Sequence, residues 1–194
     1  MAVTAQSFLP TSHGDFEVLT FASDHDLYPH VVLRTKIMNA IPVIRIHSEC
    51  MTGDVFGSLR CDCGEQLHAS MEYIQKNGGA IVYLRQEGRG IGLTEKIKAY
   101  ALQEKGLNTI QANLKLGHSA DARDYSIAVE ILQSLGWNQI HLMTNNPEKV
   151  DQLRAGGIQV IERIPVVIKA NAHNADYLRT KSDEMGHWLK DASH

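Results

Sequence analysis

The sequence contains no apolar run approaching the ~18–20 residues that a membrane-spanning helix needs. Its amino-terminal stretch also lacks the basic start and the long apolar core of a secretory signal. We therefore expect a cytoplasmic protein without a membrane partner. In that compartment thiols stay reduced, so a cluster of cysteines is expected to bind a metal or do chemistry rather than form disulfides.

Basic residues are not in excess, because 19 Lys and Arg stand against 22 Asp and Glu and give a net charge of -3. Proteins that bind nucleic acid normally carry a basic footprint, so no nucleic-acid partner is expected. Net charge says little about a single cleft, however, and a locally positive pocket for a phosphorylated metabolite remains compatible with it.

Internal repeats, low-complexity runs and Ser/Pro-rich linkers are also absent, so the sequence predicts one domain over residues 1–194. Short apolar runs broken by turn residues make 8–46 mostly β. Further along, strand-like and helix-like segments alternate. The predicted fold class is therefore α/β: a single compact domain with a mixed sheet flanked by helices and a β-rich N-terminal third.

The boundaries of the later elements follow from apolar spacing and from Gly and Pro positions. A helix carrying Leu67, Met71 and Ile74 is expected to end at Gly78. Further strands are predicted at 80–84, 140–143, 158–161 and 166–168. A second helix is predicted from the glycine-rich turn to about 104, with Ile97, Tyr100 and Ala101 on one face. Three more helices are predicted: one from near 121 to 135, one that begins at Pro147, and a C-terminal one that carries Tyr177, Leu178, Met185 and Trp188.

The three cysteines, Cys50, Cys61 and Cys63, are spaced like metal ligands. Thiolates are preferred zinc ligands, and three of them leave one tetrahedral position for water, as in a catalytic zinc site. Three buried core cysteines are the plain alternative, but Arg60, Asp62 and Gly64 interleave with the two later cysteines, which is not a core pattern. A structural zinc with His47 as fourth ligand is the second alternative, although no paired C-x-x-C knuckle is present.

Polar residues also gather where predicted strands give way to helices. The segment 86–93 has glycines at 88, 90 and 92 that would allow its backbone to approach an anion, but it lacks the Lys-Ser/Thr ending of a Walker A loop. The segments 121–124 and 144–149 are similar junctions, in which Asp121 and Asn146 could equally be helix caps. Together these junctions resemble the rim of an α/β ligand crevice.

From about Gly14 to Trp188, the chain resembles the GTP cyclohydrolase II family, whose enzymes open GTP at the entry to riboflavin biosynthesis. Five local patterns carry the resemblance in order: Arg45-Ile-His-Ser-Glu-Cys50-Met-Thr-Gly-Asp54, Ser58-Leu-Arg-Cys-Asp-Cys-Gly64, Arg85-Gln-Glu-Gly-Arg-Gly-Ile-Gly-Leu93, Asp121-Ala-Arg-Asp-Tyr125 and Leu142-Met-Thr-Asn-Asn-Pro147. Many relatives are fused to a dihydroxybutanone-phosphate synthase domain, for which this chain has no room, so we expect it to be monofunctional.

The resemblance implies conversion of GTP to 2,5-diamino-6-ribosylamino-4(3H)-pyrimidinone 5′-phosphate, formate and pyrophosphate. It implies one Zn²⁺ per subunit on the three cysteines, Mg²⁺, and a homodimer. The substrate contacts that it implies are Arg45, Ile46, His47, Ser48, Glu49, Gln66, Glu87, Gly88, Arg89, Thr109, Thr144 and Lys149. Asp121 matches the family's general base, Arg123 its proposed nucleophile and Tyr100 a tyrosine near the guanine. A guanidinium is a poor nucleophile, so electrostatic stabilisation of pyrophosphate is an equal alternative for Arg123.

Two other functions are compatible with the cysteines. A zinc hydrolase or deaminase acting on another purine nucleotide would keep them, but it usually combines zinc with an H-x-E motif, which this sequence lacks. A zinc-stabilised regulatory protein would bind GTP without releasing formate. Incubation with GTP distinguishes all three.

Overall fold

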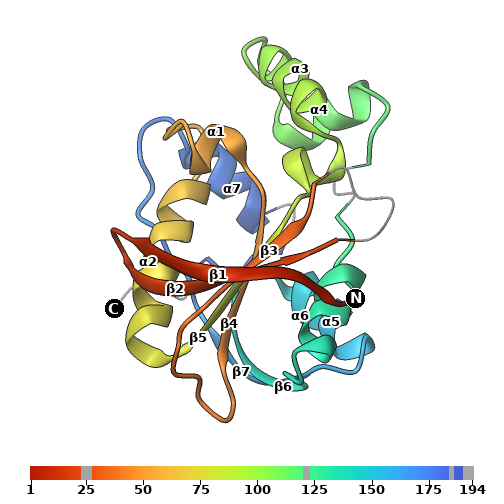
Figure 1. Cartoon of the computed structure of the whole chain (residues 1–194). Coiled ribbons are helices and arrows are strands. Elements are labelled where there is room, and N and C mark those ends of the chain that lie inside the picture. Colours follow the sequence, from red (N-terminus) through yellow and green to blue (C-terminus); the bar gives the residue numbers. More distant parts are fainter. Residues whose placement is uncertain (23–27, 120–122, 184–185, 190–194) are drawn as a thin grey trace.

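Seven strands form one mixed sheet in the order β1-β2-β3-β5-β4-β6-β7 (Figure 1). The computed structural model describes residues 1–22, 28–119, 123–183 and 186–189. Neighbouring strands from β1 to β5 pair antiparallel, and those from β5 to β7 pair parallel. The predicted α/β class with a β-rich N-terminal third is therefore confirmed. The strands are β1 (Val3–Thr11), β2 (Gly14–Phe21), β3 (His30–Arg34), β4 (Val43–Ser48), β5 (Gly79–Leu84), β6 (Gln139–Met143) and β7 (Gln159–Ile164).

Helices cover both faces of this sheet. On one face, Met71 and Ile74 of α2 pack with Phe16 of β2 and Ile81 of β5, while α5 and α6 cover the other face. The helices are α1 (Met51–Asp54), α2 (Cys63–Asn77), α3 (Leu93–Gln103), α4 (Thr109–Lys115), α5 (Ser126–Ser134), α6 (Pro147–Ala155) and α7 (Ala175–Asp183), with a 3₁₀ turn η1 (Glu87–Gly90). Among the described residues no helix has both the length and the apolar composition to cross a bilayer.

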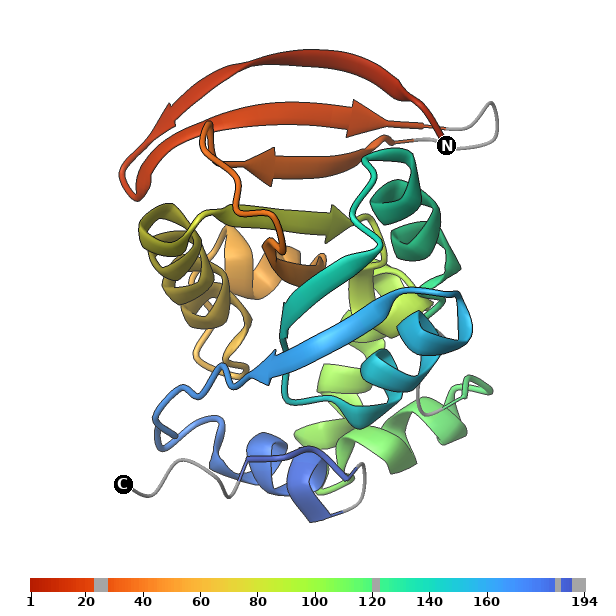
Figure 2. The ribbon, with the colours of Figure 1, turned by 90° about the horizontal axis from the view of Figure 1, so that it is seen from below.

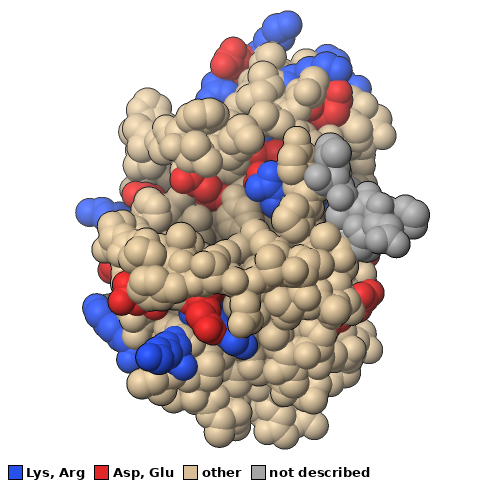
Figure 3. All heavy atoms as spheres, viewed as in Figure 1, with Lys and Arg blue, Asp and Glu red and all other residues tan. Residues whose placement is uncertain are grey.

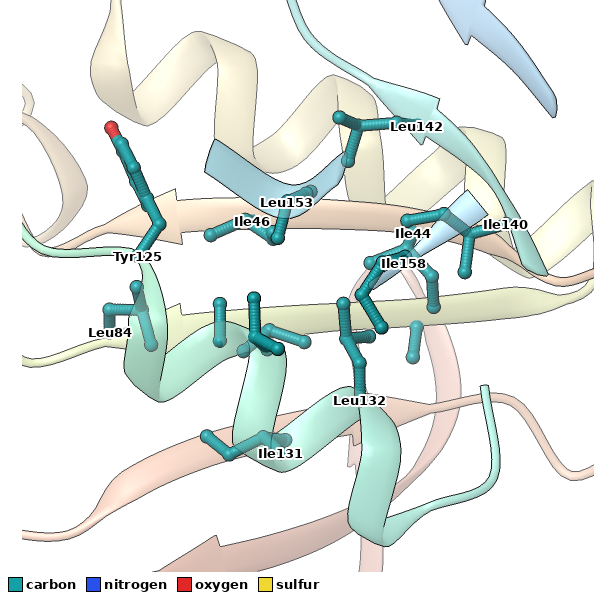
Figure 4. Packing of buried hydrophobic residues seen from close by; sticks show 14 of the residues in the cluster. Ile44, Ile46, Leu84, Tyr125, Ile131, Leu132, Ile140, Leu142, Leu153 and Ile158 are labelled. Carbon is teal, nitrogen blue, oxygen red and sulfur yellow. The ribbon is translucent and has the colours of Figure 1, made fainter. Parts of the chain in front are cut away.

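The larger core lies between the sheet and α5. Figure 4 shows Ile131 and Leu132 of α5 lying beneath Ile44 of β4 and Leu84 of β5, and all four side chains are fully buried. Burying a side chain of this size contributes about 1.5–3 kcal/mol. The same cluster fixes β4 and β5 side by side, so the loops that follow these two strands leave the sheet at the same edge.

Several boundaries agree with the sequence. Helix α2 ends at Gly78, whose φ of 70° suits a residue without a side chain. Helix α6 begins at Pro147, and the Asn146 side chain accepts a hydrogen bond from the Glu148 amide. Asn146 is therefore a helix cap. The predicted strands at 80–84 and 140–143 are also present as β5 and β6.

The helix predicted from near residue 121 begins only at Ser126, and residues 120–122 lie outside the described part. The cause is Gln86, whose side-chain amide brackets the backbone of Asp124: its Oε1 accepts from the Asp124 N–H at 3.0 Å and its Nε2 donates to the Asp124 carbonyl at 2.7 Å. The Asp124 carboxylate then accepts from the Ser126 amide at 2.8 Å. These bonds hold 123–125 out of the helix.

The strand predicted at 166–168 is wrong. The backbone N–H and C=O of Val166 bond to the Asn145 side chain, at 3.1 and 2.6 Å, and not to a neighbouring strand. The C-terminal helix is shorter than predicted, since α7 ends at Asp183 and Trp188 follows it outside any helix.

Helix α3 is present, but the side chains of its expected apolar face are not in the core. Ile97 is 48% exposed, and Ala99 is the residue of α3 that is buried. The reason is position: α3 and α4 stand beyond the end of the sheet (Figure 1). Helix α4 begins with a capping box between Asn108 and Gln111 and was not expected.

Strand direction creates a crevice between β4 and β6. These strands are parallel neighbours, yet the chain leaves β4 towards β5 through α2 and leaves β6 towards β7 through α6. Connections that diverge in this way open a crevice at the carboxyl ends of the strands, where α/β proteins bind ligands. Figure 2 shows α7 at the same side of the molecule as α3 and α4.

Charged groups on the face that carries the β1–β2 hairpin are mixed. Figure 3 shows a hollow above the hairpin, with groups of both signs at its margin. On this face Lys and Arg are not gathered into one broad patch.

Candidate active site

A single pocket at the β4–β6 crevice brings the sequence-predicted site residues together. Its wall is formed by the segments that follow β4, β5 and β6, together with α3 and α7. Of the predicted residues, it is lined by Arg45, His47, Ser48, Glu49, Cys50, Cys61, Cys63, Gln66, Glu87, Gly88, Arg89, Tyr100, Thr109, Arg123, Thr144 and Lys149. The Ile46 side chain instead lies in the core, and its carbonyl accepts a 2.7 Å hydrogen bond from Lys149. Asp121 lies outside the described residues.

The three cysteine sulfurs form one cluster at the start of α1 and α2. The Sγ atoms of Cys50 and Cys61 are 3.7 Å apart, and all three sulfurs lie within 4.8 Å of one another. Tetrahedral zinc with Zn–S bonds of about 2.3 Å places two sulfurs about 3.8 Å apart. The cysteines therefore fit a metal ion, and among the described residues no His, Asp or Glu joins the cluster as a fourth ligand.

Gly53 makes room for this cluster. A Cβ atom at this position would lie 2.9 Å from the Cys61 sulfur and 3.2 Å from the Cys50 sulfur. Contacts to a real Cβ below 3.0 Å essentially never occur, so any side chain here would displace the Cys61 sulfur and press on the Cys50 sulfur. The backbone of α1 at Gly53 thus forms a cradle against the sulfurs of Cys50 and Cys61 and the Cβ of Cys63.

We predict that Gly53→Ala lowers metal affinity about tenfold or more, because changes around metal ligands typically cost 10–100-fold. Competition with a chromogenic chelator measures this affinity. The matched control is Gly156→Ala, whose added methyl group would meet Val129 at 2.6 Å, far from the cysteines in the α5–α6 packing. The control should lose thermal stability and keep its metal affinity; equal metal affinity in both variants would contradict the cradle.

Positive charge faces the sulfurs. The Lys96 ammonium donates to Cys50 Sγ at 3.1 Å and to a Glu87 carboxylate oxygen at 2.9 Å. Hydrogen bonds from Cys61 and Cys63, with Lys96 nearby, hold the pKa of the Cys50 thiol far below its ordinary value. Burial lowers the pKa of Lys96, but the Cys50 thiolate and Glu87 outweigh burial and raise it. A thiolate is thus favoured at Cys50 even before a metal binds.

His47 is held by a buried carboxylate. Asp54, whose side chain is 3% exposed, accepts from His47 Nε2 at 3.1 Å, from the Tyr83 hydroxyl at 2.8 Å and from the Cys50 amide at 3.0 Å. Burial lowers the pKa of His47, so the ring is neutral near pH 7. The group of described side chains placed to hold a metal ion contains the three cysteines and not His47, so His47 is not the fourth ligand that was considered; it lies in β4 and lines the pocket.

Strand β4 presents polar atoms without partners. Arg45 Nε, His47 Nδ1 and Ser48 Oγ are buried and have no hydrogen-bond partner among the described residues. Buried polar groups normally find a partner, and such exceptions require an explanation. All three residues line the same pocket, so a bound ligand or ordered water is the natural explanation for these unpartnered atoms.

Cations also gather in the pocket around His187. Burial, then Lys181, Arg123, Arg89 and Lys149, lower the pKa of His187 to about 3. Arg89 adopts a left-handed φ of 62°, directly after Gly88 at 64°, which places successive N–H groups of η1 in a strained turn. Strained turns of this kind cluster at ligand sites. The arrangement suits a multiply charged anion.

The pocket residues that were missed from the sequence include Lys96, Tyr177, Lys181 and His187. Lys96 could have been suspected, since it follows the glycine-rich segment by one helical turn. The other three lie in and after α7, where no local pattern distinguishes them from a solvated helix.

Comparison with known proteins agrees with this geometry. The family model described as GTP cyclohydrolase II matches residues 2–165. The GTP cyclohydrolase-2 proteins of two Buchnera aphidicola subspecies are similar: that from Schizaphis graminum is 52% identical over 95% of this chain and 95% of its own length, and that from Acyrthosiphon pisum is 49% identical over 98% and 100%. The riboflavin biosynthesis protein RibBA of Phocaeicola vulgatus is 50% identical over 93% of this chain.

The chain spans about half the length of the RibBA proteins that it matches, 46% in the Phocaeicola vulgatus protein, and nearly all of the two GTP cyclohydrolase-2 proteins. The family model covers far more than half of the chain, and its matched range includes all three cysteines and the η1 turn. This chain belongs to the GTP cyclohydrolase II family.

Proposed function

We propose that this chain converts GTP and water to 2,5-diamino-6-ribosylamino-4(3H)-pyrimidinone 5′-phosphate, formate and pyrophosphate, as the first step of riboflavin biosynthesis. One observation carries the proposal: the lining of a single pocket combines a cluster of three thiols with a group of cations. GTP has matching parts, a purine ring to be opened and a triphosphate to be held. Family membership supports the same assignment.

Cys50, Cys61 and Cys63 would hold one zinc ion per subunit. Zinc on three thiolates supplies activated water at neutral pH, which suits attack on the electron-poor C8 of guanine. The chain's own contribution is to keep the ligands charged and close together. Lys96 donates to Cys50, and Gly53 leaves the sulfurs their space.

Arg89, Arg123 and Lys149 would hold the triphosphate, together with magnesium from solution. Lys149 is 4% exposed and already donates to the Ile46 carbonyl, so its ammonium is fixed in place. Fixed cations stabilise charge that develops on a leaving pyrophosphate without reorganising. Thr144, Glu49, Gln66 and Thr109 would complete the nucleotide contacts from the surrounding wall.

Tyr100 would act at the guanine end, near the cysteines. Its hydroxyl lies 3.5 Å from the Thr52 hydroxyl, and burial raises its pKa, which keeps the phenol protonated and able to donate. Asp121 would serve as general base. Arg123 would act at the phosphate, where its charge would stabilise the leaving pyrophosphate. Residues 123–125 are not helical, so the arrangement before α5 leaves the Arg123 side chain in the pocket wall.

The remaining proposals concern the whole molecule. We propose that residues 1–194 act as one catalytic domain and that two such chains form a homodimer. The sheet includes strands from β1 to β7, and the pocket is lined by residues from β4 to α7 of the same chain, which supports one catalytic domain. Sedimentation or light scattering measures the oligomeric state directly.

The function is tested by incubating the metallated protein with GTP and Mg²⁺. Formate, pyrophosphate and the diaminopyrimidine product, which is followed by its absorbance, should form in equal amounts. ATP should give none of these products. Tight GTP binding without formate would instead indicate a regulatory protein. Equal turnover of another purine nucleotide would indicate a different hydrolase, and either result would overturn the proposal.

A further inference from the structure

The carboxyl-terminal segment, defined here as α7 and residues 186–189, lies beyond residue 165, where the family model ends. It nevertheless docks on the pocket. The Trp188 amide donates to the Asn145 carbonyl at 2.9 Å, and the Arg163 guanidinium lies 5.0 Å from the Trp188 ring. Tyr177 lies under the Arg89 guanidinium at 5.9 Å. The segment therefore spans from the end of β6 to η1.

Lys181 makes the most specific of these contacts. Its ammonium donates to an Asp62 carboxylate oxygen at 2.8 Å, with the lysine 11% and the aspartate 2% exposed, and it lies 4.4 Å from the Tyr177 ring. Asp62 stands between two of the clustered cysteines. Lys181 and Asp62 are far apart in sequence, and their ion pair is deeply buried. Such a pair fixes the positions of both side chains, which an exposed ion pair does not.

Asp62 is connected to Arg45 by hydrogen bonds through Gln66. The other Asp62 carboxylate oxygen accepts from the Gln66 side-chain nitrogen, and the Gln66 oxygen accepts from Arg45. This amide orientation is fixed by chemistry, because the NH₂ group must face the carboxylate and the oxygen must face the guanidinium. Arg45 also donates to the Met143 carbonyl at 3.1 Å. A chain of charge-assisted bonds thus leads from α7 to β4.

We infer that the carboxyl-terminal segment is a wall of the nucleotide site and that Lys181 is a positioning residue, which sets Arg45 through Asp62 and Gln66. The inference rests on the proposed function, since Arg45 is the group that would contact the nucleotide. With Lys181 in place, Arg45 keeps one direction and its unpartnered Nε stays available to a ligand. Without it, Asp62 is a buried carboxylate that has lost its cation, and Gln66 and Arg45 rearrange around it.

Binding of a non-hydrolysable GTP analogue tests the inference without requiring turnover. Lys181→Met should weaken binding about tenfold or more, the usual effect of losing a charge-assisted hydrogen bond. Lys181→Arg should bind within about threefold of wild type. Lys105→Met, an exposed lysine after α3, is the matched control and should change nothing.

A double-mutant cycle with Asp62→Asn separates positioning from a direct phosphate contact. If Lys181 acts through Asp62, the double variant should bind about as well as the weaker single variant. Additive losses, or normal binding by Lys181→Met, would overturn the role of Lys181. A wild-type protein that does not bind the analogue at all would overturn the proposed function instead.

The wild-type chain offers a second measurement should Lys181→Met fail to fold. Trypsin cleaves after Arg179 and Lys181, both in α7. A bound analogue that rests against this wall should slow cleavage at these two sites about tenfold, while cleavage at Lys105 continues at its usual rate. An unchanged rate at Arg179 and Lys181 with saturating analogue would contradict the wall.

Discussion

Cys61→Ser is expected to remove the bound zinc and to reduce formate release below about one hundredth of the wild-type rate. Changes beyond the ligand shell already cost 10–100-fold, and loss of a ligand costs more. A serine hydroxyl does not ionise near neutral pH, so two thiolates would remain where three lie within 4.8 Å of one another. Metal content by mass spectrometry and formate by enzymatic assay measure the two effects.

The rate of pyrophosphate release should stay within about tenfold of wild type in the same variant. This step depends on the cations around His187, and Cys61→Ser leaves those side chains unchanged. Ser58→Ala, three residues earlier in the same loop, is the matched control and should retain zinc and both products. Chelation of the wild-type protein should reproduce the variant, and added zinc should reverse it. Formate production at the normal rate without metal would refute the zinc mechanism.

Prediction from the sequence succeeded where a local signal decides the structure. Helix α2 has an apolar stripe and a glycine end, and α6 has Asn146 and Pro147 at its start. It failed where a distant group decides. Val166 pairs with the Asn145 side chain, and Gln86 holds Asp124 out of α5. In both pairs the two residues are far apart in sequence, so no rule based on residue spacing could predict these contacts.

The site shows the same division. The family patterns placed the cysteines, η1 and the 144–149 junction, and the structure brings all of them to one pocket. Lys181 and Asp62 are 119 residues apart, and neither has a neighbour pattern that suggests the other. The role of Asp54 was likewise invisible, because its partners His47 and Tyr83 come from two different strands. Tertiary packing alone creates these contacts.

Arg123 is expected to be essential and to act as a fixed cation. Its side chain lines the pocket, with the guanidinium 5.8 Å from the Tyr125 ring, and it belongs to the group of cations around His187. Arg123→Ala should slow release of pyrophosphate about a hundredfold to a thousandfold, the usual cost of removing one preorganised donor from a developing anion. Arg123→Lys, which keeps the charge but not the planar fork, should recover part of that loss.

The alternative is that Arg123 attacks the α-phosphorus and carries the nucleotide through a P–N bond. A guanidinium has no lone pair to offer unless it loses a proton, and its pKa exceeds about 12. We therefore expect no nucleotide on Arg123 when a single turnover of α-labelled GTP is quenched in base, where a P–N bond survives. Guanidinium ion added to Arg123→Ala should restore pyrophosphate release. A labelled peptide containing Arg123, formed and consumed as fast as pyrophosphate appears, would establish covalent attack instead, since a fixed cation leaves no such mark.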